Sequence, residues 1–276
     1  MTRLPTHALA LLLLAASPAA TAQTPPPAAT GAPAIDAGLR AAVADPGRSP
    51  AQRARDVYRH PAETLAFFGI RPTDTVIEIS PGTGWYSAIL APYLRHHGHY
   101  IAASATPAPG RSNGLRAVFS ADPARYDRAT LLEYDGKAPV LGAPGTADAV
   151  LTFRNVHNWV SAGTADAYFQ AFFAALKPGG TLGVVEHRAQ PGTDLDTMKT
   201  SGYLTEALVI ELATRAGFVL DGRSEVNANP RDTADHPNGV WTLPPTNRHD
   251  AADDARYQAI GESDRMTLRF RKPASD

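Results

Sequence analysis

The segment Thr75-Val-Ile-Glu-Ile-Ser-Pro-Gly-Thr-Gly-Trp-Tyr86 joins a short run of β-branched residues to a glycine-containing turn. The run at 75–80 is apolar and bounded by turn residues, which is typical of a buried strand, and 85–96 has the pattern of a helix. Glycine allows a backbone to pass close to a ligand, and the first turn of a helix presents unpaired N–H groups. We therefore predict a strand–turn–helix unit whose turn borders a ligand site.

Similar units follow this segment along the chain. Apolar runs predict further strands at 99–104, 129–134, 148–153, 180–187, 218–225 and 266–271, and helical patterns lie between them at 114–126, 164–176 and 205–216. Two helical segments, 35–44 and 49–68, precede the first strand. The alternation predicts an α/β, doubly wound Rossmann-like fold, with a parallel sheet covered on both faces, in a single domain over 35–276.

Residues 1–22 resemble a secretory signal peptide. Arg3 precedes an apolar run at 8–16, and Ala20-Thr21-Ala22 has the small-x-small form that signal peptidase cleaves. The apolar run is too short to span a bilayer. The Pro/Ala-rich stretch 23–34 predicts an extended linker. We therefore expect a periplasmic or secreted protein with no stable membrane anchor after cleavage.

The composition excludes several classes of function. Among 276 residues, 26 Lys and Arg balance 27 Asp and Glu, so the net charge of −1 provides no footprint for nucleic acid. The absence of cysteine excludes disulfides, thiolate nucleophiles and cysteine-ligated zinc. We expect a small-molecule substrate and no nucleic-acid partner, and the sequence does not indicate an oligomeric state.

The stretch 227–264 interrupts the alternation. It is rich in Pro, Asn, Asp and Gly and contains Val240-Trp241-Thr242-Leu243. Structureless loops of this length are uncommon in compact domains and usually serve as lids or binding loops. Since an isolated Trp generally needs a surface to dock against, we interpret the stretch as a lid insertion.

Two histidines follow neighbouring central strands. His157 lies just after the strand 148–153, and Glu186-His187 ends the strand 180–187. An imidazole at this edge of the sheet can act as a general base, ligate a metal or cap a strand end by bonding to backbone. Glu186 completes a two-His, one-carboxylate set, but strand alternation predicts that Glu186 and His187 point to opposite faces, so we assign no metal ligands.

The chain also resembles a known family. Residues 76–86 are similar to the first motif of class I S-adenosylmethionine (SAM)-dependent methyltransferases, 152–159 to their fourth motif, and 176–187 to the loop and strand that follow it. More narrowly, PGTGWYSAILAPYL, LTFRNVHNW, LKPGGTLGVVEHRA, GVWTLPP and GESDRMTLRF together resemble a family of predicted exported (periplasmic) bacterial methyltransferases. The resemblance implies a seven-stranded sheet whose last strand is antiparallel.

The resemblance assigns roles residue by residue. It implies that SAM is the cofactor and that its contacts include Glu78, Ser80, Gly82, Gly84, Asp135 and Asn155. Asn155 would lie beside the departing methyl group and Asp135 beside the adenine. Ser80 stands where the family has its first glycine, and the strand 99–104 is followed by Ala105 rather than by an acidic residue.

Further residues are candidates for the substrate pocket and the lid. The aromatic ones are Tyr86, Trp159, Tyr203 and Trp241, each of which can equally be plain core. Arg265 can bind a substrate carboxylate through its fork or form a surface ion pair with Asp264 or Glu262. Arg55, Arg59 and His60 are interpreted as a solvated helical face rather than as a roof over the cleft.

We therefore expect SAM-dependent methyl transfer to a small-molecule acceptor. His157 or His187 would remove the acceptor's proton, with Glu186 beside them, and the stretch 227–264 would close over the substrate. One alternative is a SAM-independent periplasmic hydrolase, lyase or isomerase on the same fold, with or without a metal. Another is a periplasmic ligand-binding protein without catalytic activity.

Overall fold

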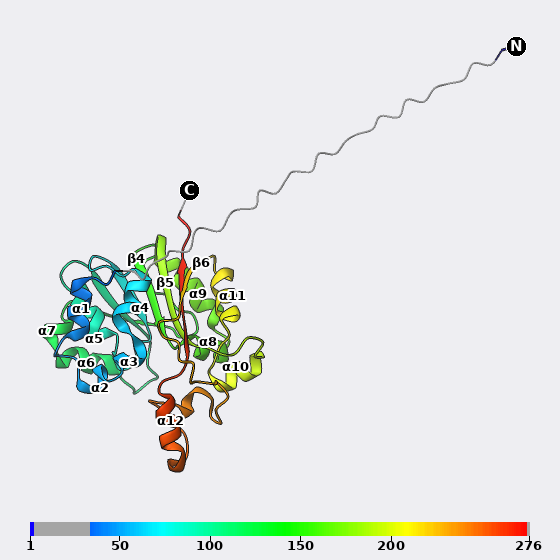
Figure 1. The fold of residues 1–276 in the computed structure, drawn as a ribbon. Helices are drawn as coiled ribbons and strands as arrows, with labels where there is room; N and C mark the ends of the chain where they lie inside the picture. Colours follow the sequence, from blue (N-terminus) through cyan, green and yellow to red (C-terminus); the bar gives the residue numbers. More distant parts are fainter. Residues whose placement is uncertain (3–33, 275–276) are drawn as a thin grey trace. The chain divides into compact units, whose positions relative to one another are not determined.

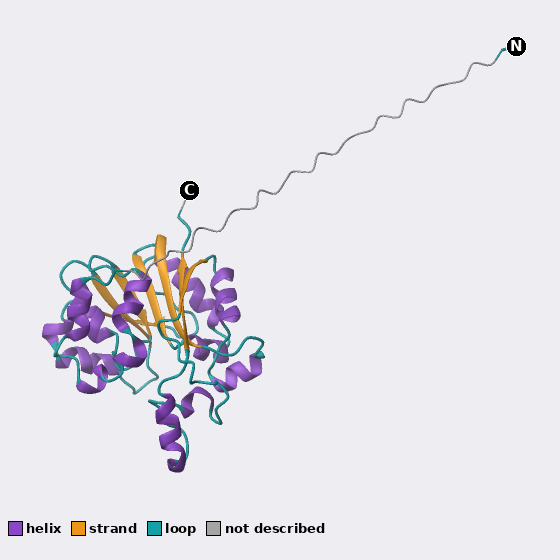
Figure 2. Cartoon of the chain, in the orientation of Figure 1, coloured by secondary structure: helices purple, strands orange, loops and turns teal. Residues whose placement is uncertain are grey.

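The computed structural model describes residues 1–2 and 34–274. The predicted signal peptide, except for its first two residues, and the predicted linker, except for Ala34, therefore lie outside the described residues. Within them, a central sheet is flanked by helices on both faces (Figures 1 and 2). No helix in the described residues has the length and apolar character needed to cross a bilayer.

The sheet has seven strands in the order β3-β2-β1-β4-β5-β7-β6. Their bounds are β1 Thr75–Ile79, β2 His99–Ala105, β3 Thr130–Tyr134, β4 Ala147–Phe153, β5 Leu176–His187, β6 Val219–Ser224 and β7 Arg265–Arg271. Strands β1 to β5 are parallel, and β7 runs antiparallel to both β5 and β6. The predicted doubly wound, seven-stranded fold with an antiparallel last strand is confirmed.

The helices surround this sheet. Their bounds are α1 Ala37–Ala44, α2 Pro50–Arg53, α3 Asp56–Arg59, α4 Pro61–Phe68, α5 Ser87–Leu94, α6 Gly114–Ala121, α7 Pro123–Tyr126, α8 Val156–Ala162, α9 Ala165–Ala175, α10 Leu195–Ser201, α11 Glu206–Arg215 and α12 Asp254–Ile260. The single helix predicted at 114–126 is in fact two, because Pro123 begins a new helix that the side chain of Asp122 caps. Helices α8, α10 and α12 were absent from the sequence prediction, since each is short.

Two apolar cores lie on opposite faces of the sheet. One contains Phe169 and Phe172 of α9, and the other contains Leu65 of α4 and Ile89 of α5. These fully buried side chains explain why the strands consist of nearly continuous apolar runs, as expected for a sheet covered on both faces. The strands contribute polar groups to the candidate site only near their carboxyl ends and at the start of β7.

The turn between β1 and α5 opens the sheet at that edge. Ser80 and Gly82 both have left-handed backbone angles, with φ of 49° and 63°. The amide of Ser80 is anchored by the carbonyl of Ala103 on β2 at 2.7 Å. Strand β1 lies between β2 and β4. From β1 the chain first adds β2 and β3 on one side and then crosses over to add β4 on the other side. This reversal of strand order leaves a crevice at the carboxyl ends of the strands.

The stretch 227–264 is ordered rather than structureless. It contains the 3₁₀ turns η1 Gly239–Thr242 and η2 Ala251–Asp253 as well as α12. The side-chain amide of Asn227 donates to Thr64 and Thr267 at 2.9 Å, and the hydroxyl of Tyr203 donates to Asp232 at 3.0 Å. Polar bonds to residues distant in the sequence therefore hold the stretch, and this is why its composition alone suggested a loop without structure.

Candidate functional site

A cavity of about 340 Å³ opens at the carboxyl ends of the central strands, within the size range of small-molecule pockets. Its walls come from the β1–α5 turn, the ends of β4 and β5, the N-terminal helices, and residues 240–246 of the stretch after β6. The predicted site residues that line it are Glu78, Ser80, Gly82, Tyr86, Asn155, His157, His187, Trp241 and Arg265. One cavity therefore gathers residues from both the cofactor and the acceptor assignments.

Two predicted cofactor residues do not line the cavity. Asp135 is exposed, and its carboxylate accepts from the backbone amide of Lys137 at 2.9 Å, so it caps its own turn. Gly84, with φ of 81°, packs against Leu115, since a Cβ placed there would lie 3.3 Å from that side chain. The cavity therefore does not reach Asp135, the residue predicted to contact adenine.

Two of the predicted aromatic residues are core residues instead. Trp159 stacks on Tyr168 of α9, with ring centroids 4.1 Å apart. Tyr203 is buried and bonded to Asp232, although its ring lies edge-on to His187. Trp159 lies on the face of α8 that packs on α9, which strand and helix patterns alone did not resolve.

His157 and Glu186 form a buried hydrogen-bonded pair. Nδ1 of His157 lies 2.9 Å from Oε1 of Glu186, and the backbone amide of His157 donates to Oε2 at 3.2 Å. With Nδ1–H donating to the carboxylate, Nε2 is the ring nitrogen that can accept a proton. Glu186 itself is not among the cavity-lining residues, so its role is to orient His157.

The prediction that Glu186 and His187 point apart was wrong. Ligand atoms of His157, Glu186 and His187 all lie within 4.8 Å of one another. The carboxylate of Glu186 folds back along the end of β5 and accepts from the backbone amide of His187 at 2.8 Å. Strand alternation sets the side-chain direction of residues that are paired on both sides. It does not fix where the end of a long side chain lies at the last residues of a strand.

His187 occupies a different environment from His157. Its Nδ1 lies 2.5 Å from the hydroxyl of Ser263, just before β7. Burial, followed by the positive charge of nearby groups including Arg265 and Arg154, lowers the pKa of His187 well below its usual value. His187 is therefore neutral at physiological pH and contributes hydrogen bonds rather than charge.

Glu78 is buried beneath the β1–α5 turn. Its Oε2 accepts from the hydroxyl of Tyr100 at 2.6 Å. Burial raises the pKa of Glu78 to about 7, although hydrogen bonds from Tyr100 and Ser87 oppose that rise. The carboxyl group therefore exchanges its proton near neutrality, unlike an exposed glutamate.

This shift predicts a pH-dependent stability that a Glu78→Gln variant removes. Because the folded-state pKa exceeds the unfolded value, the folded chain binds the extra proton and wild-type stability falls as pH rises from about 4.5 to about 7. Between pH 5 and pH 8, we expect the wild type to lose about 2 kcal/mol more than the variant. Urea unfolding at both pH values measures this difference, and equal losses would contradict it.

Four arginines, Arg55, Arg59, Arg154 and Arg265, line the cavity; we call them the arginine cluster. Three of them bind Glu262. Nε of Arg55 lies 2.5 Å and Nε of Arg59 3.1 Å from its carboxylate oxygens, and Arg265 binds the same group. Burial would raise the pKa of Glu262, but Arg265, Arg59 and Arg55 outweigh it and lower that pKa to about 2.

This arrangement corrects two expectations. Arg59 is 3% exposed and Arg265 is 2% exposed, so neither belongs to a solvated helical face or to a surface ion pair. Arg265 does form the predicted ion pair with Glu262, but this pair is buried and does not lie on the surface. A buried N–H group without an acceptor costs about 1–3 kcal/mol, and Arg59 Nη2 and Arg265 Nε have no acceptor among the described residues.

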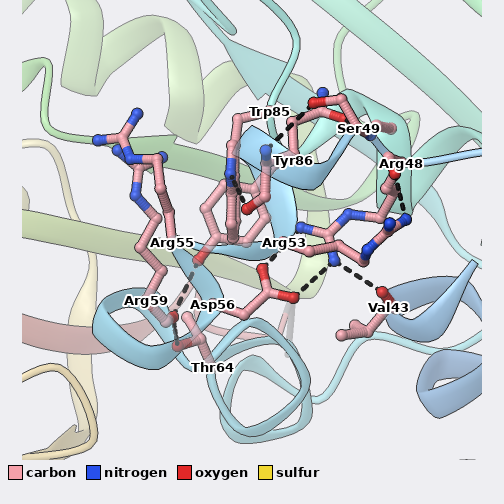
Figure 3. A network of polar contacts seen from close by, with 12 residues as sticks. Val43, Arg48, Ser49, Arg53, Arg55, Asp56, Arg59, Thr64, Trp85 and Tyr86 are labelled. Carbon is pink, nitrogen blue, oxygen red and sulfur yellow. Dashed lines mark hydrogen bonds and ion pairs between the residues drawn. The ribbon is translucent and has the colours of Figure 1, made fainter. Parts of the chain in front are cut away.

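Trp85 holds Arg59 in place. Its ring lies between two guanidinium groups, with the Cζ atoms of Arg59 and Arg48 at 4.7 and 5.1 Å from the ring centroid (Figure 3). Its Nε1 donates to the carbonyl of Gln52 at 3.0 Å, and Arg48 is clamped by Asp56 at 2.7 Å. The N-terminal helices thus act as a rigid wall of the cavity.

Arg154 was not predicted as a site residue. It directly follows β4, its φ of 61° is left-handed, and its amide donates to the carbonyl of Val185 at 2.7 Å. Its guanidinium forms no hydrogen bond or ion pair within residues 34–274. Burial and the neighbouring Arg265 lower the pKa of Arg154 to about 10, so the group stays charged at neutral pH.

The arrangement of strands matches known enzymes in fold. A SAM-dependent methyltransferase from Aquifex aeolicus aligns over 81% of this chain and 94% of its own, with a TM-score of 0.53 and 13% sequence identity. The [4+2]-cyclase SpnF aligns over 86% and 92%, with a TM-score of 0.54 and 17% identity. The chain therefore has the fold of class I SAM-dependent methyltransferases, and one protein similar to it is a cyclase.

No family model matches the sequence. No curated protein matches it either.

Proposed function

We propose that this protein transfers a methyl group from SAM to a small-molecule acceptor. The observation that carries the proposal is that a single cavity is lined by both the glycine turn after β1 and His157, whose ring is paired with Glu186 behind the wall. In doubly wound sheets this edge is where ligands bind. Methyl transfer to a protonated acceptor requires a base and a cofactor-binding turn, and both border this one cavity.

The residues at the β1–α5 turn fit the amino-acid end of SAM. A Cβ placed on Gly82 would meet no atom within 4 Å, so the backbone there faces open space. Ser80, Gly82 and Thr83 would hold that end of the cofactor, and Glu78 lies beneath them. When bound, SAM supplies an electrophilic methyl group. Neither Ala105 nor Asp135 offers the usual contacts for its nucleoside.

The protein's own groups supply the remaining steps. Nε2 of His157 accepts the acceptor's proton, while Glu186 stabilises the resulting positive charge through Nδ1–H. Trp241 lies edge-on to His157 at 6.1 Å between ring centroids and, with Pro244 and Pro245, forms an apolar part of the cavity wall. Asn155 donates to the carbonyl of Ile79 at 3.0 Å and holds the ends of β1 and β4 together.

Calorimetric titration with S-adenosylhomocysteine tests the cofactor assignment. We expect saturable binding by the wild type and at least ~10-fold weaker binding by Gly82→Ala, because a methyl group there enters the open space. Gly69→Ala is the matched control, since Gly69 also has a left-handed φ and free space but lies outside the cavity. Absence of binding by the wild type would overturn the proposal.

A second candidate is a SAM-independent enzyme that uses the same two histidines. Two features of the site support it: no acidic residue ends β2, and the carboxylate of Asp135 already accepts a hydrogen bond within its own turn. The cyclase that is similar in fold supports it as well. Turnover of a substrate without SAM would favour it. Ligand binding without any turnover would favour the non-catalytic alternative.

We propose in addition that the chain is exported and belongs with the exported bacterial methyltransferases that its motifs resemble. The support is the signal-like sequence at 1–22 and the combination of motifs across 81–270. Mass spectrometry of protein from the periplasm should find an N-terminus near Gln23. An intact Met1 in a cytoplasmic fraction would overturn this part of the proposal.

A further inference from the structure

The arginine cluster holds more hydrogen-bond donors than the protein satisfies. Arg55 Nη2, Arg59 Nη2 and Arg265 Nε are buried without an acceptor in the described part of the chain. Since buried N–H groups in folded proteins are nearly always paired, these three donors indicate a ligand that brings acceptor oxygens. The guanidinium of Arg154 also has no hydrogen-bond or ion-pair partner there, and Arg154 is half-buried in the cavity wall, where its guanidinium is accessible to such a ligand.

The charge of the cavity favours an anion over a cation. Glu262 is shared by three arginines, Glu186 is occupied by three N–H donors, and Glu78 accepts from Tyr100. Four guanidinium groups therefore outnumber the three carboxylates even when all three are ionised. This excess of positive charge opposes a metal ion at the His157–Glu186–His187 cluster, despite its suitable donor set.

The geometry points to an anionic acceptor: we propose that Arg154, with Arg59 and Arg265 beside it, binds a carboxylate or phosphate group of the molecule to be methylated. A planar guanidinium can donate two parallel hydrogen bonds to either group. The proposal rests on the proposed function only in naming the ligand as the acceptor.

The position of Arg154 supports this assignment over a purely structural one. Its left-handed backbone is held by the bond to Val185, and such conformations persist mainly where the surroundings enforce them. His157 follows three residues later and lines the same cavity. An acceptor anchored by its anionic group at Arg154 would share the cavity with the stacked rings of Tyr86 and Phe153 and with the proposed base, His157.

Anion binding can be measured without SAM. We expect inorganic phosphate or malonate, titrated into the purified protein in low-chloride buffer, to bind saturably, and Arg154→Gln to weaken that binding at least ~10-fold. Arg154→Lys should fall between the two, because it keeps the charge but loses the fork. Arg40→Gln, an exposed arginine of α1, controls for net charge and should leave binding unchanged. Which of the two anions binds distinguishes a phosphate from a carboxylate acceptor.

The outcomes separate this proposal from the proposed function. S-adenosylhomocysteine should bind Arg154→Gln as it binds the wild type. An equal loss for both ligands would assign Arg154 to the cofactor's own carboxylate and overturn the proposal, as would a lack of saturable binding of either anion. Anion binding without S-adenosylhomocysteine binding would instead refute only SAM dependence. If Arg154→Gln does not fold, Arg154→Lys carries the test alone, with weaker anion binding and unchanged affinity for S-adenosylhomocysteine as the expected result.

Discussion

His157→Ala is expected to lower the rate of methyl transfer by about 10²–10⁴-fold, the usual contribution of a general base. The imidazole is the group in the cavity whose Nε2 can take the acceptor's proton, because Glu186 fixes the other ring nitrogen. The measurement is release of S-adenosylhomocysteine at saturating SAM, with small hydroxy and amino carboxylates or phosphates as acceptors. Affinity for S-adenosylhomocysteine should change little.

Two variants sharpen this result. Glu186→Gln removes the charge that orients His157 and replaces one acceptor oxygen with a donor, so kcat should fall while the affinity for S-adenosylhomocysteine is kept. His97→Ala, in the exposed turn before β2, is the matched control and should retain full activity. If His157→Ala remained fully active, the general-base assignment would be wrong and His187 would be the next residue to replace.

Gly239→Ala is expected to have the largest effect on stability. A Cβ at Gly239 would lie 2.1 Å from the carbonyl oxygen and 2.5 Å from the Cα of Ser201, and both are backbone atoms. With a left-handed φ of 56° as well, the substitution should cost about 3 kcal/mol or more, or lift η1 away from α10. Urea unfolding measures the first effect, and limited proteolysis of 227–264 reports the second.

The matched control for this variant is Gly163→Ala. Gly163 also has a left-handed φ, of 70°, but a Cβ there would meet no atom within 4 Å. It should therefore cost only the backbone strain, about 1–2 kcal/mol, and leave 227–264 resistant to protease. Equal losses from the two variants would mean that the contact with Ser201 is not what fixes η1.

The sheet was predictable from sequence because each of its signals is local. A strand such as Thr75–Ile79 is an uninterrupted apolar run, and the turn after it contains the two glycines that mark its end. The three-helix segment 37–59 and the ordered stretch 227–264 were harder. Their short elements depend on long-range anchors, such as the bonds of Asn227 to Thr64 and Thr267.

The candidate site was predicted only in part, for a similar reason. His157, His187 and the glycine turn follow strand ends, so topology alone brings them to one edge of the sheet. The arginine cluster brings together residues from three separate segments of the chain. Only two weak features of the sequence indicate it. Arg55 and Arg59 share a helical face through their spacing of four, and Arg154 stands beside Asn155 at the end of a central strand.

The excursion between β6 and β7 begins and ends at one point of the sheet. The amide of Arg265 donates to the carbonyl of Asn227 at 3.2 Å, and the adjoining residues Ser224 and Thr267 are partners in the β6–β7 ladder. A segment tethered in this way can be lengthened, shortened or replaced at little entropic cost to the sheet. Natural variation or engineering could therefore change which molecules enter the cavity by exchanging residues 227–264, while the sheet and its helices stay the same.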